Sequence, residues 1–430
     1  MTGQEAVDYE LEVWARTLLI GSRRPSAAEL VKAYRILAQV NPNAYELQLA
    51  RALVNLSWDQ GRQNAQQRLP LLEEAVATAR TVFGREPTRT KPLIDALDPY
   101  QVTLYELGRR AEGLAVRMEM AEVSHAADNP VEKRSGLQPL AYGLAEEGRY
   151  DEAAVMLKEI VEIEIPEYFC MTTWDQFSLV ATLEAAGQVG AAVHALNRVL
   201  NNARSQLAIH KTSLSDVFHM LVWYAVLADR AEQTGDAVSA RTEAADLLGR
   251  LAESGEPRGR SGEQFTTAGI LITAQASDVE PIVPGQPRPA FGVDMSDWSR
   301  DLRIRYVEQI GANLCECGPV SADTMAHAAQ RELRLPQLAT LRRRIAIRTA
   351  AYGLWHLGHS FLTATLPAFD DSVAAASQWR VEDGASADRA LIKALTDRSM
   401  VLVAGHRYGD ALADYQQAMT YIERSGAALN

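Results

Sequence analysis

The sequence predicts an all-α protein built from repeated helical hairpins. Apolar residues recur along much of the chain with the spacing of an α-helix. Glycines interrupt this spacing at intervals of roughly 40 to 48 residues, which is typical of a helical repeat protein. The 430 residues are 47% hydrophobic and 23% charged, as expected for a folded chain of two or three domains or one extended array.

The clearest repeat unit lies within residues 137–163. Apolar residues follow a helical period through 137–144 and resume it through 153–160. Gly148 stands between the two runs, and we expect it to end the first helix with a positive φ. Ala153 is small enough to let the second helix approach the first closely. The segment is therefore predicted to be a helical hairpin.

The same pattern recurs around Gly108, Gly187 and Gly235. Leucine or tyrosine residues precede each glycine at similar offsets, and a small residue follows it. Each glycine is therefore expected to end the first helix of a hairpin. Four such units aligned on one anchor indicate a repeat array.

The last hairpin matches a known repeat most closely, through Tyr408, Ala411, Tyr415 and Ala418. This pattern resembles the tetratricopeptide repeat, and the longer spacing resembles the extended repeats of actinobacterial tetratricopeptide proteins. The resemblance covers residues 42–250 and 390–424. It implies a right-handed superhelix, or α-solenoid, whose first helices line a concave groove. It implies a binding surface and no shared catalytic residues.

The chain is expected to have four parts. Residues 1–41 form an N-terminal helical cap, with Ser26 as a helix N-cap beside a proline. Residues 42–252 form a first sub-array. Residues 253–300, rich in proline and glycine, form an irregular linker with one short helix. Residues 301–430 form a second sub-array.

In the first sub-array, the offsets from the glycines predict an acidic groove that contains aromatic residues. Aromatic side chains in a groove anchor peptides, and carboxylates favour basic segments. The alternative is that the aromatic residues pack between repeats and the acids form a solvated face. The candidate residues are Asp95, Asp98, Tyr142, Glu146, Trp174, Phe177, Glu184 and Asp229.

In the second sub-array, the same offsets predict a more basic groove. Clustered guanidinium groups hold phosphates or acidic segments through forked hydrogen bonds. The alternative is a surface helix whose arginines pair with neighbouring acids. The candidate residues are Arg305, Arg344, Arg348, Tyr352, Trp355 and His356.

Catalytic and metal-binding motifs are not recognisable in the sequence. Cys315 and Cys317, with His327 further on, form the only metal-like group. This group lacks a fourth ligand and the paired spacing of zinc sites, and residues two apart on a helix point to different faces. We therefore expect no catalytic site, no metal site and no cofactor.

The expected function is that of a protein-binding or peptide-binding scaffold, or a regulatory adaptor, in the cytoplasm. The net charge of −12 argues against direct nucleic-acid binding. No apolar run reaches the length of a membrane span, and three cysteines fit a reducing compartment. A regulatory protein that senses a ligand or signal peptide, and an enzyme or accessory subunit in a biosynthetic pathway, remain alternatives. The partner and the oligomeric state stay open.

Overall fold

The computed structural model is helical in almost every residue that it describes, and the prediction of an all-α solenoid is confirmed. The described residues contain helices, turns and one short 3₁₀-helix, Gly384–Ala387, but no strand. They are 9–59, 64–163, 169–208, 212–256, 271, 272, 274, 334–356 and 361–425.

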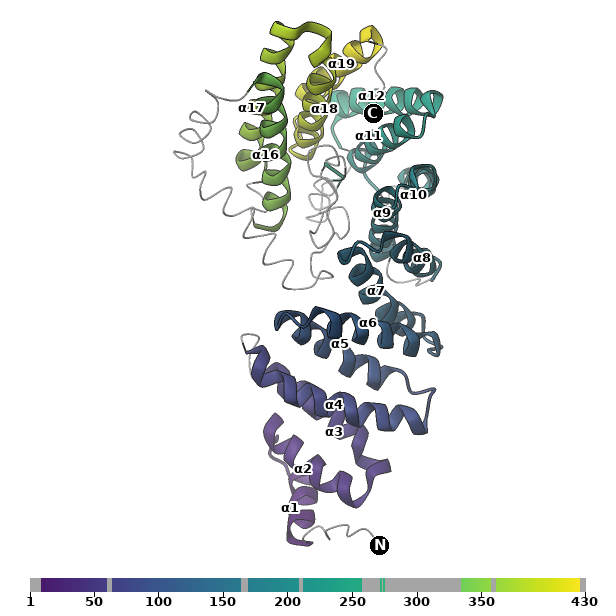
Figure 1. Ribbon diagram of the computed structural model, residues 1–430, viewed down its shortest axis with the longest axis vertical. Helices are drawn as coiled ribbons and strands as arrows, with labels where there is room; N and C mark the ends of the chain where they lie inside the picture. The colour runs from purple at the N-terminus through teal and green to yellow at the C-terminus, as the bar shows by residue number, and fades with distance from the viewer. Residues whose placement is uncertain are drawn as a thin grey trace. The chain divides into compact units, whose positions relative to one another are not determined.

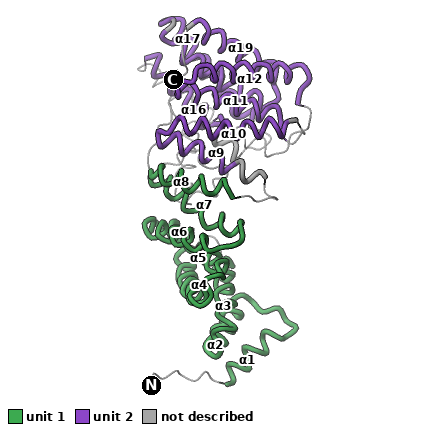
Figure 2. The backbone as a smooth tube through the Cα atoms, turned by 90° about the vertical axis from the view of Figure 1, so that its right-hand side faces the viewer, with its two compact units in different colours: residues 1–168, 296–301 green, residues 169–295, 302–430 purple. Residues whose placement is uncertain are grey.

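The chain divides into two compact units (Figure 2). The first comprises residues 1–168 with 296–301, and its consecutive helices pack against one another in chain order (Figure 1). Its helices are α1 (Tyr9–Ile20), α2 (Ala27–Val40), α3 (Pro42–Asp59), α4 (Ala65–Arg85), α5 (Lys91–Glu106), α6 (Arg110–His125), α7 (Pro130–Glu146) and α8 (Tyr150–Val161).

The second unit comprises residues 169–295 with 302–430. Its helices also pack as consecutive pairs, both before and after the part of the chain that is not described. They are α9 (Phe169–Ala185), α10 (Val189–Ala208), α11 (Leu214–Arg230), α12 (Thr234–Ser254), α16 (Leu335–His356), α17 (Phe361–Asp383), α18 (Asp388–Ala404) and α19 (Tyr408–Ser425).

Left-handed residues end the first helix of several hairpins. Gly108, Gly148 and Gly187 have φ angles of 73°, 75° and 74°, which confirms the role predicted for them. After Gly148, the backbone N–H of Arg149 donates to the carbonyl of Leu144 at 2.9 Å. This bond closes a Schellman motif and satisfies a carbonyl that the helix end leaves unpaired.

The prediction that Gly235 ends the first helix of its hairpin is wrong. Glu232, with a φ of 60°, occupies the left-handed position, while Gly235 lies in the first turn of α12. The backbone N–H of Gln233 donates to Ala228 at 2.8 Å, as in the other hairpins. Because glutamate occupies the left-handed position, a pattern based on helix-ending glycines selects Gly235, three residues further along the chain. His406, at 61°, plays the same part between α18 and α19.

The N-cap expected at Ser26 is confirmed. Its hydroxyl accepts from the backbone N–H of Glu29 at 3.3 Å, and the Glu29 carboxylate accepts from the backbone N–H of Ser26 at 2.9 Å. This reciprocal capping box satisfies two donors at the start of α2.

Arginine–glutamate pairs connect the second helices of successive hairpins. Each pair spans 39 residues, close to one repeat, and most of these side chains are partly exposed. Exposed pairs of this kind contribute at most about 1 kcal/mol each, so apolar packing provides most of the stability. The pairs are Arg35–Glu74, Arg80–Glu119 and Arg204–Glu243.

The C-terminal hairpin packs on α11 and α12. Helix α19 lies against α12, and α18 contacts α11. Phe218 and Tyr415 meet edge to face at 5.5 Å between ring centroids, and His219 Nε2 lies 3.0 Å from the Met400 carbonyl oxygen. These contacts join segments on either side of the predicted linker, 253–300. Most of that linker lies outside the described residues.

Candidate functional site

A recess opens on the face formed by the first helices of the unit 1 hairpins. Helix α3 contacts α5, and α5 contacts α7, so these three helices present one surface. The recess has a volume of about 560 Å³. Its lining residues are Ala50, Arg51, Val54, Asn55, Trp58, Lys91, Pro92, Ile94, Asp95, Asp98, Pro99 and Ser135. We call it the α3–α5 recess.

Helical periodicity places these side chains together. On α3, Arg51, Asn55 and Trp58 follow one another by four and three residues and so share one face. The opposite face of α3 is buried, as Leu53 is fully inaccessible. Trp58 remains 47% exposed, which is unusual for a side chain of this size.

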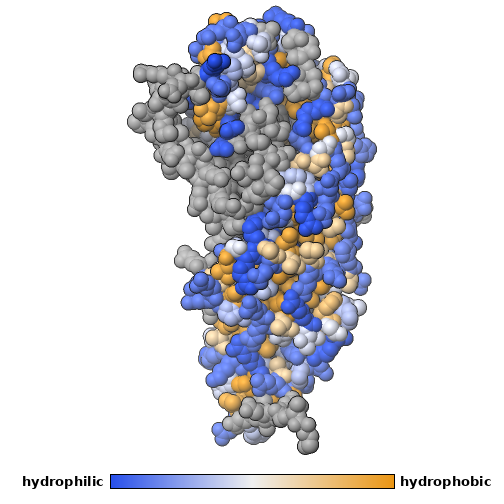
Figure 3. Space-filling model, viewed as in Figure 1, coloured by the Kyte–Doolittle hydropathy of each residue, from blue (hydrophilic) through white to orange (hydrophobic). Residues whose placement is uncertain are grey.

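The lining of the α3–α5 recess is amphipathic. Its apolar lining consists of alanine, valine, isoleucine and proline side chains together with Trp58, and its charged groups come from α3 and α5. The surface of unit 1 in Figure 3 is likewise mixed, with apolar patches among hydrophilic residues. This composition suits an occupant that has both an apolar and a polar part.

The charges in the recess are unevenly paired. Lys91 Nζ lies 2.9 Å from Asp95 Oδ1 in an exposed ion pair, so Asp95 already has a cationic partner. Asp98 accepts a hydrogen bond from Gln101 Nε2 at 3.2 Å, and within the described part of the chain it has no ion pair. Desolvation raises the pKa of the Asp98 carboxyl, opposed by the Gln101 hydrogen bond and by the charge of Arg117. Asp98 is exposed in the recess lining, so its carboxylate is accessible to a cation from outside.

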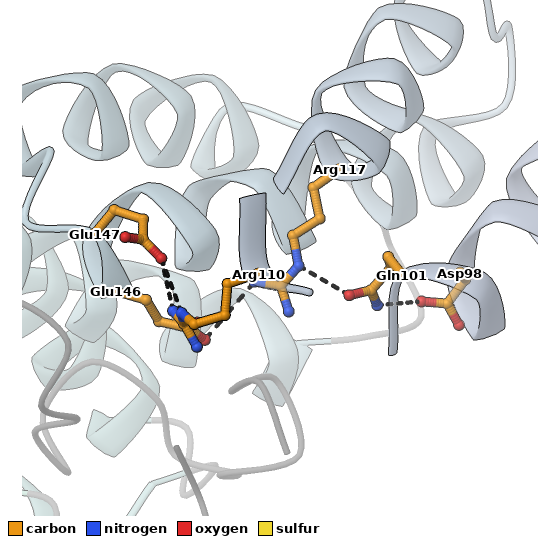
Figure 4. Close-up of polar contacts among 6 residues, drawn as sticks. All are labelled: Asp98, Gln101, Arg110, Arg117, Glu146 and Glu147. Atoms are coloured by element: carbon orange, nitrogen blue, oxygen red, sulfur yellow. Dashed lines mark hydrogen bonds and ion pairs between the residues drawn. The ribbon is translucent and has the colours of Figure 1, made fainter. Parts of the chain in front are cut away.

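A polar network runs from the exposed Asp98 into the hairpin interior, where Gln101, Arg117 and Glu146 are buried (Figure 4). Arg117 Nε donates to Gln101 Oε1 at 2.9 Å, and Arg117 Nη1 lies 3.7 Å from Glu146 Oε1. Arg110 then donates to Glu146 at 3.0 Å and to Glu147 at 2.7 Å. The network fixes the side of α5 that carries Asp98 against α6 and α7.

Tyr105 forms part of the same interior. The Arg117 guanidinium lies 4.2 Å from its ring centroid, and burial raises its pKa to about 12. Gly113 makes room for the ring, because a Cβ there would lie 2.7 Å from a ring carbon. Sequence reasoning missed this cluster, although a small residue at the same offset in each hairpin was a signal of close helix contact.

The residues predicted for the first groove separate into two groups. Asp95 and Asp98 line the α3–α5 recess, and Trp174 is half-buried with its ring edge to face against Phe177. The expectation of an open groove fails for the remaining residues, which are at most 4% exposed. They are Tyr142, Glu146, Phe177, Glu184 and Asp229.

Buried carboxylates in this set bind arginines of the protein itself. Glu184 pairs with Arg230, and Asp229 pairs with Arg241. The physical reason is that the last turn of each first helix lies beneath neighbouring helices, where a charge requires a partner. These carboxylates stabilise the packing of the hairpins and are not accessible to a bound partner.

In the second groove, the described arginines belong to a packed helix. Arg344 and Arg348 are half-buried on α16. Beside them, Arg342 pairs with Asp371 at 3.1 Å, and Arg343 pairs with the buried Asp397 at 2.6 Å. For Arg342 and Arg343 this agrees with the alternative in which the arginines pair with neighbouring acids.

Other expected features fall outside the described part. Arg305, Cys315, Cys317 and His327 lie there, as do the side chains of Tyr352, Trp355 and His356. Among the described residues, no group of three or more His, Cys, Asp or Glu side chains is arranged to hold a metal. Within the same ranges, no helix is long and apolar enough to span a bilayer.

No protein-family model matches this chain, and no curated protein shows significant similarity to it. The functional argument therefore depends on the geometry of the α3–α5 recess.

Proposed function

We propose that this chain is a non-catalytic binding protein, a scaffold or regulatory adaptor, that holds a peptide or protein segment on the first-helix face of unit 1. The observation that carries the proposal is the α3–α5 recess with Trp58 exposed in its wall. Exposed tryptophans in a concave site are typical anchors of protein recognition because they bury a large area with little loss of side-chain entropy.

The repeat architecture supports the same function. Stacked hairpins place successive first helices side by side, so a bound segment contacts several helices at once. The recess already takes residues from α3, α5 and α7. Its rigid backing, which includes the buried pairs around Arg117, keeps the surface preformed and lowers the entropic cost of binding.

A peptide selection tests this proposal directly. A library of random linear peptides is selected on the full chain, and the enriched peptides are measured against two tryptophan variants. Asn55→Trp fills the α3–α5 recess from an exposed position. Met118→Trp places the same bulk at a half-exposed position on α6, outside the recess, and serves as the matched control.

We expect enriched peptides that lose affinity for Asn55→Trp and keep it for Met118→Trp. Circular dichroism confirms that both variants are folded. Failure to enrich any peptide would refute the proposal. So would enriched peptides whose Kd is the same for the two variants.

A further inference from the structure

We infer that the α3–α5 recess takes one lysine or arginine side chain from the bound segment, with Asp98 as its counter-ion and Trp58 against its methylene stem. This inference rests on the function proposed above and specifies the partner chemistry. The occupant must be partly apolar, because Val54, Ile94 and Pro99 line the recess together with the charged groups. Long basic side chains have this character, with an apolar stem and a charged head.

Asp98 is the anionic group that best fits this role. Lys91 holds Asp95 at 2.9 Å, whereas Asp98 has only the amide of Gln101 as a hydrogen-bonding partner in the described structure. Asp98 is an exposed residue of the recess lining, and the helices packed beside it desolvate its carboxyl in part and raise its pKa. A cation seated beside it would replace the lost hydration and return the pKa toward lower values.

Trp58 provides the second element. An indole face attracts a cation by its quadrupole and also packs against methylene groups. Trp58 and Asp98 come from neighbouring helices and line the same recess. One occupant can therefore contact the aromatic face and the carboxylate together.

The remaining charges limit the number of basic residues. Arg51 is exposed in the lining, and Lys91 is also present beside Asp95. Additional positive charge on the occupant would be repelled by these groups. The recess is therefore specific for a single basic residue in a neutral context and does not favour a polybasic segment.

The test uses capped nine-residue peptides of glycine, serine and alanine with lysine, norleucine or glutamate at the centre. A fourth peptide carries three consecutive lysines. Binding to the full chain labelled with 5-fluorotryptophan is followed by fluorine NMR. Trp58→Phe identifies the Trp58 resonance by its disappearance.

We expect the lysine peptide to shift the Trp58 resonance and the norleucine and glutamate peptides to shift it far less at equal concentration. Asp98→Asn should weaken the lysine peptide about five- to ten-fold. Glu122→Gln removes the same charge from an exposed position on α6 and should leave Kd unchanged. Higher salt should weaken only the lysine peptides, and three lysines should bind no better than one.

Two results would overturn the inference. One is equal binding of the lysine and norleucine peptides, and the other is an unchanged Kd for the lysine peptide in Asp98→Asn. The proposed function would survive either result if selected peptides still lost affinity for Asn55→Trp. The proposed function would fail if no peptide bound the recess.

Discussion

Replacing two glycines of unit 2 with alanine should have opposite effects on stability. Only one of them, Gly187, occupies the left-handed position that ends the first helix of a hairpin. Gly187 has a φ of 74°, and an added Cβ would meet nothing within 4 Å. Gly187→Ala therefore changes only the backbone energy, and a left-handed alanine costs about 1 to 2 kcal/mol. Gly235 lies in the first turn of α12 with equally open space. Gly235→Ala should instead stabilise by up to about 1 kcal/mol.

Urea denaturation followed by far-ultraviolet circular dichroism measures this difference. The two alanine variants should differ by about 2 kcal/mol, roughly a thirty-fold difference in the unfolding equilibrium constant. Glu232→Gly provides a third measurement, because it replaces a left-handed glutamate with the residue that best tolerates this conformation. It should stabilise by about 1 kcal/mol. Equal destabilisation by Gly187→Ala and Gly235→Ala would show that the hairpin turn is placed wrongly.

Two further predictions concern buried charge and titration. Asp229→Ala leaves the buried Arg241 without this ion pair and should cost about 3 to 5 kcal/mol in the urea denaturation assay. Glu119→Ala breaks a partly exposed pair and should cost less than about 1 kcal/mol in the same assay. Comparable losses would contradict the burial argument. The raised pKa of Tyr105, about 12, means that its neutral phenol contributes stability that is complete below about pH 10 and lost as the pH rises toward 12. The unfolding free energy of the wild type should therefore fall by up to about 2 to 3 kcal/mol more than that of Tyr105→Phe over this pH range. Parallel pH profiles of the two unfolding free energies would contradict a buried phenol.

Local patterns predicted the hairpins well because helix formation and helix ends depend on nearby residues. Gly108, Gly148 and Gly187 supply the positive φ that a Schellman motif requires, and Ser26 supplies the N-cap. The error at Gly235 has a local cause. Glutamate occupies the left-handed position at Glu232, and composition alone does not identify a strained residue.

The candidate site was predicted only in part. Asp95 and Asp98 were expected on the binding face and do line the α3–α5 recess. Trp58 was missed because it lies at the end of α3, before the first glycine-anchored unit. Glu146 and Asp229 were expected to face solvent, but neighbouring helices bury them. Helical offsets identify a face of one helix and do not show which helices cover it.

The sequence by itself determined the helical hairpins and the turn residues that end several of them, since these follow from periodicity and backbone preference within a few tens of residues. Tertiary structure alone decided which carboxylates are buried against arginines and which remain open in the recess. It alone brought α19 against α12, with Phe218 meeting Tyr415 across almost two hundred residues of chain. Such contacts depend on the shapes of surfaces that meet only after the hairpins form, and no spacing in the sequence records them.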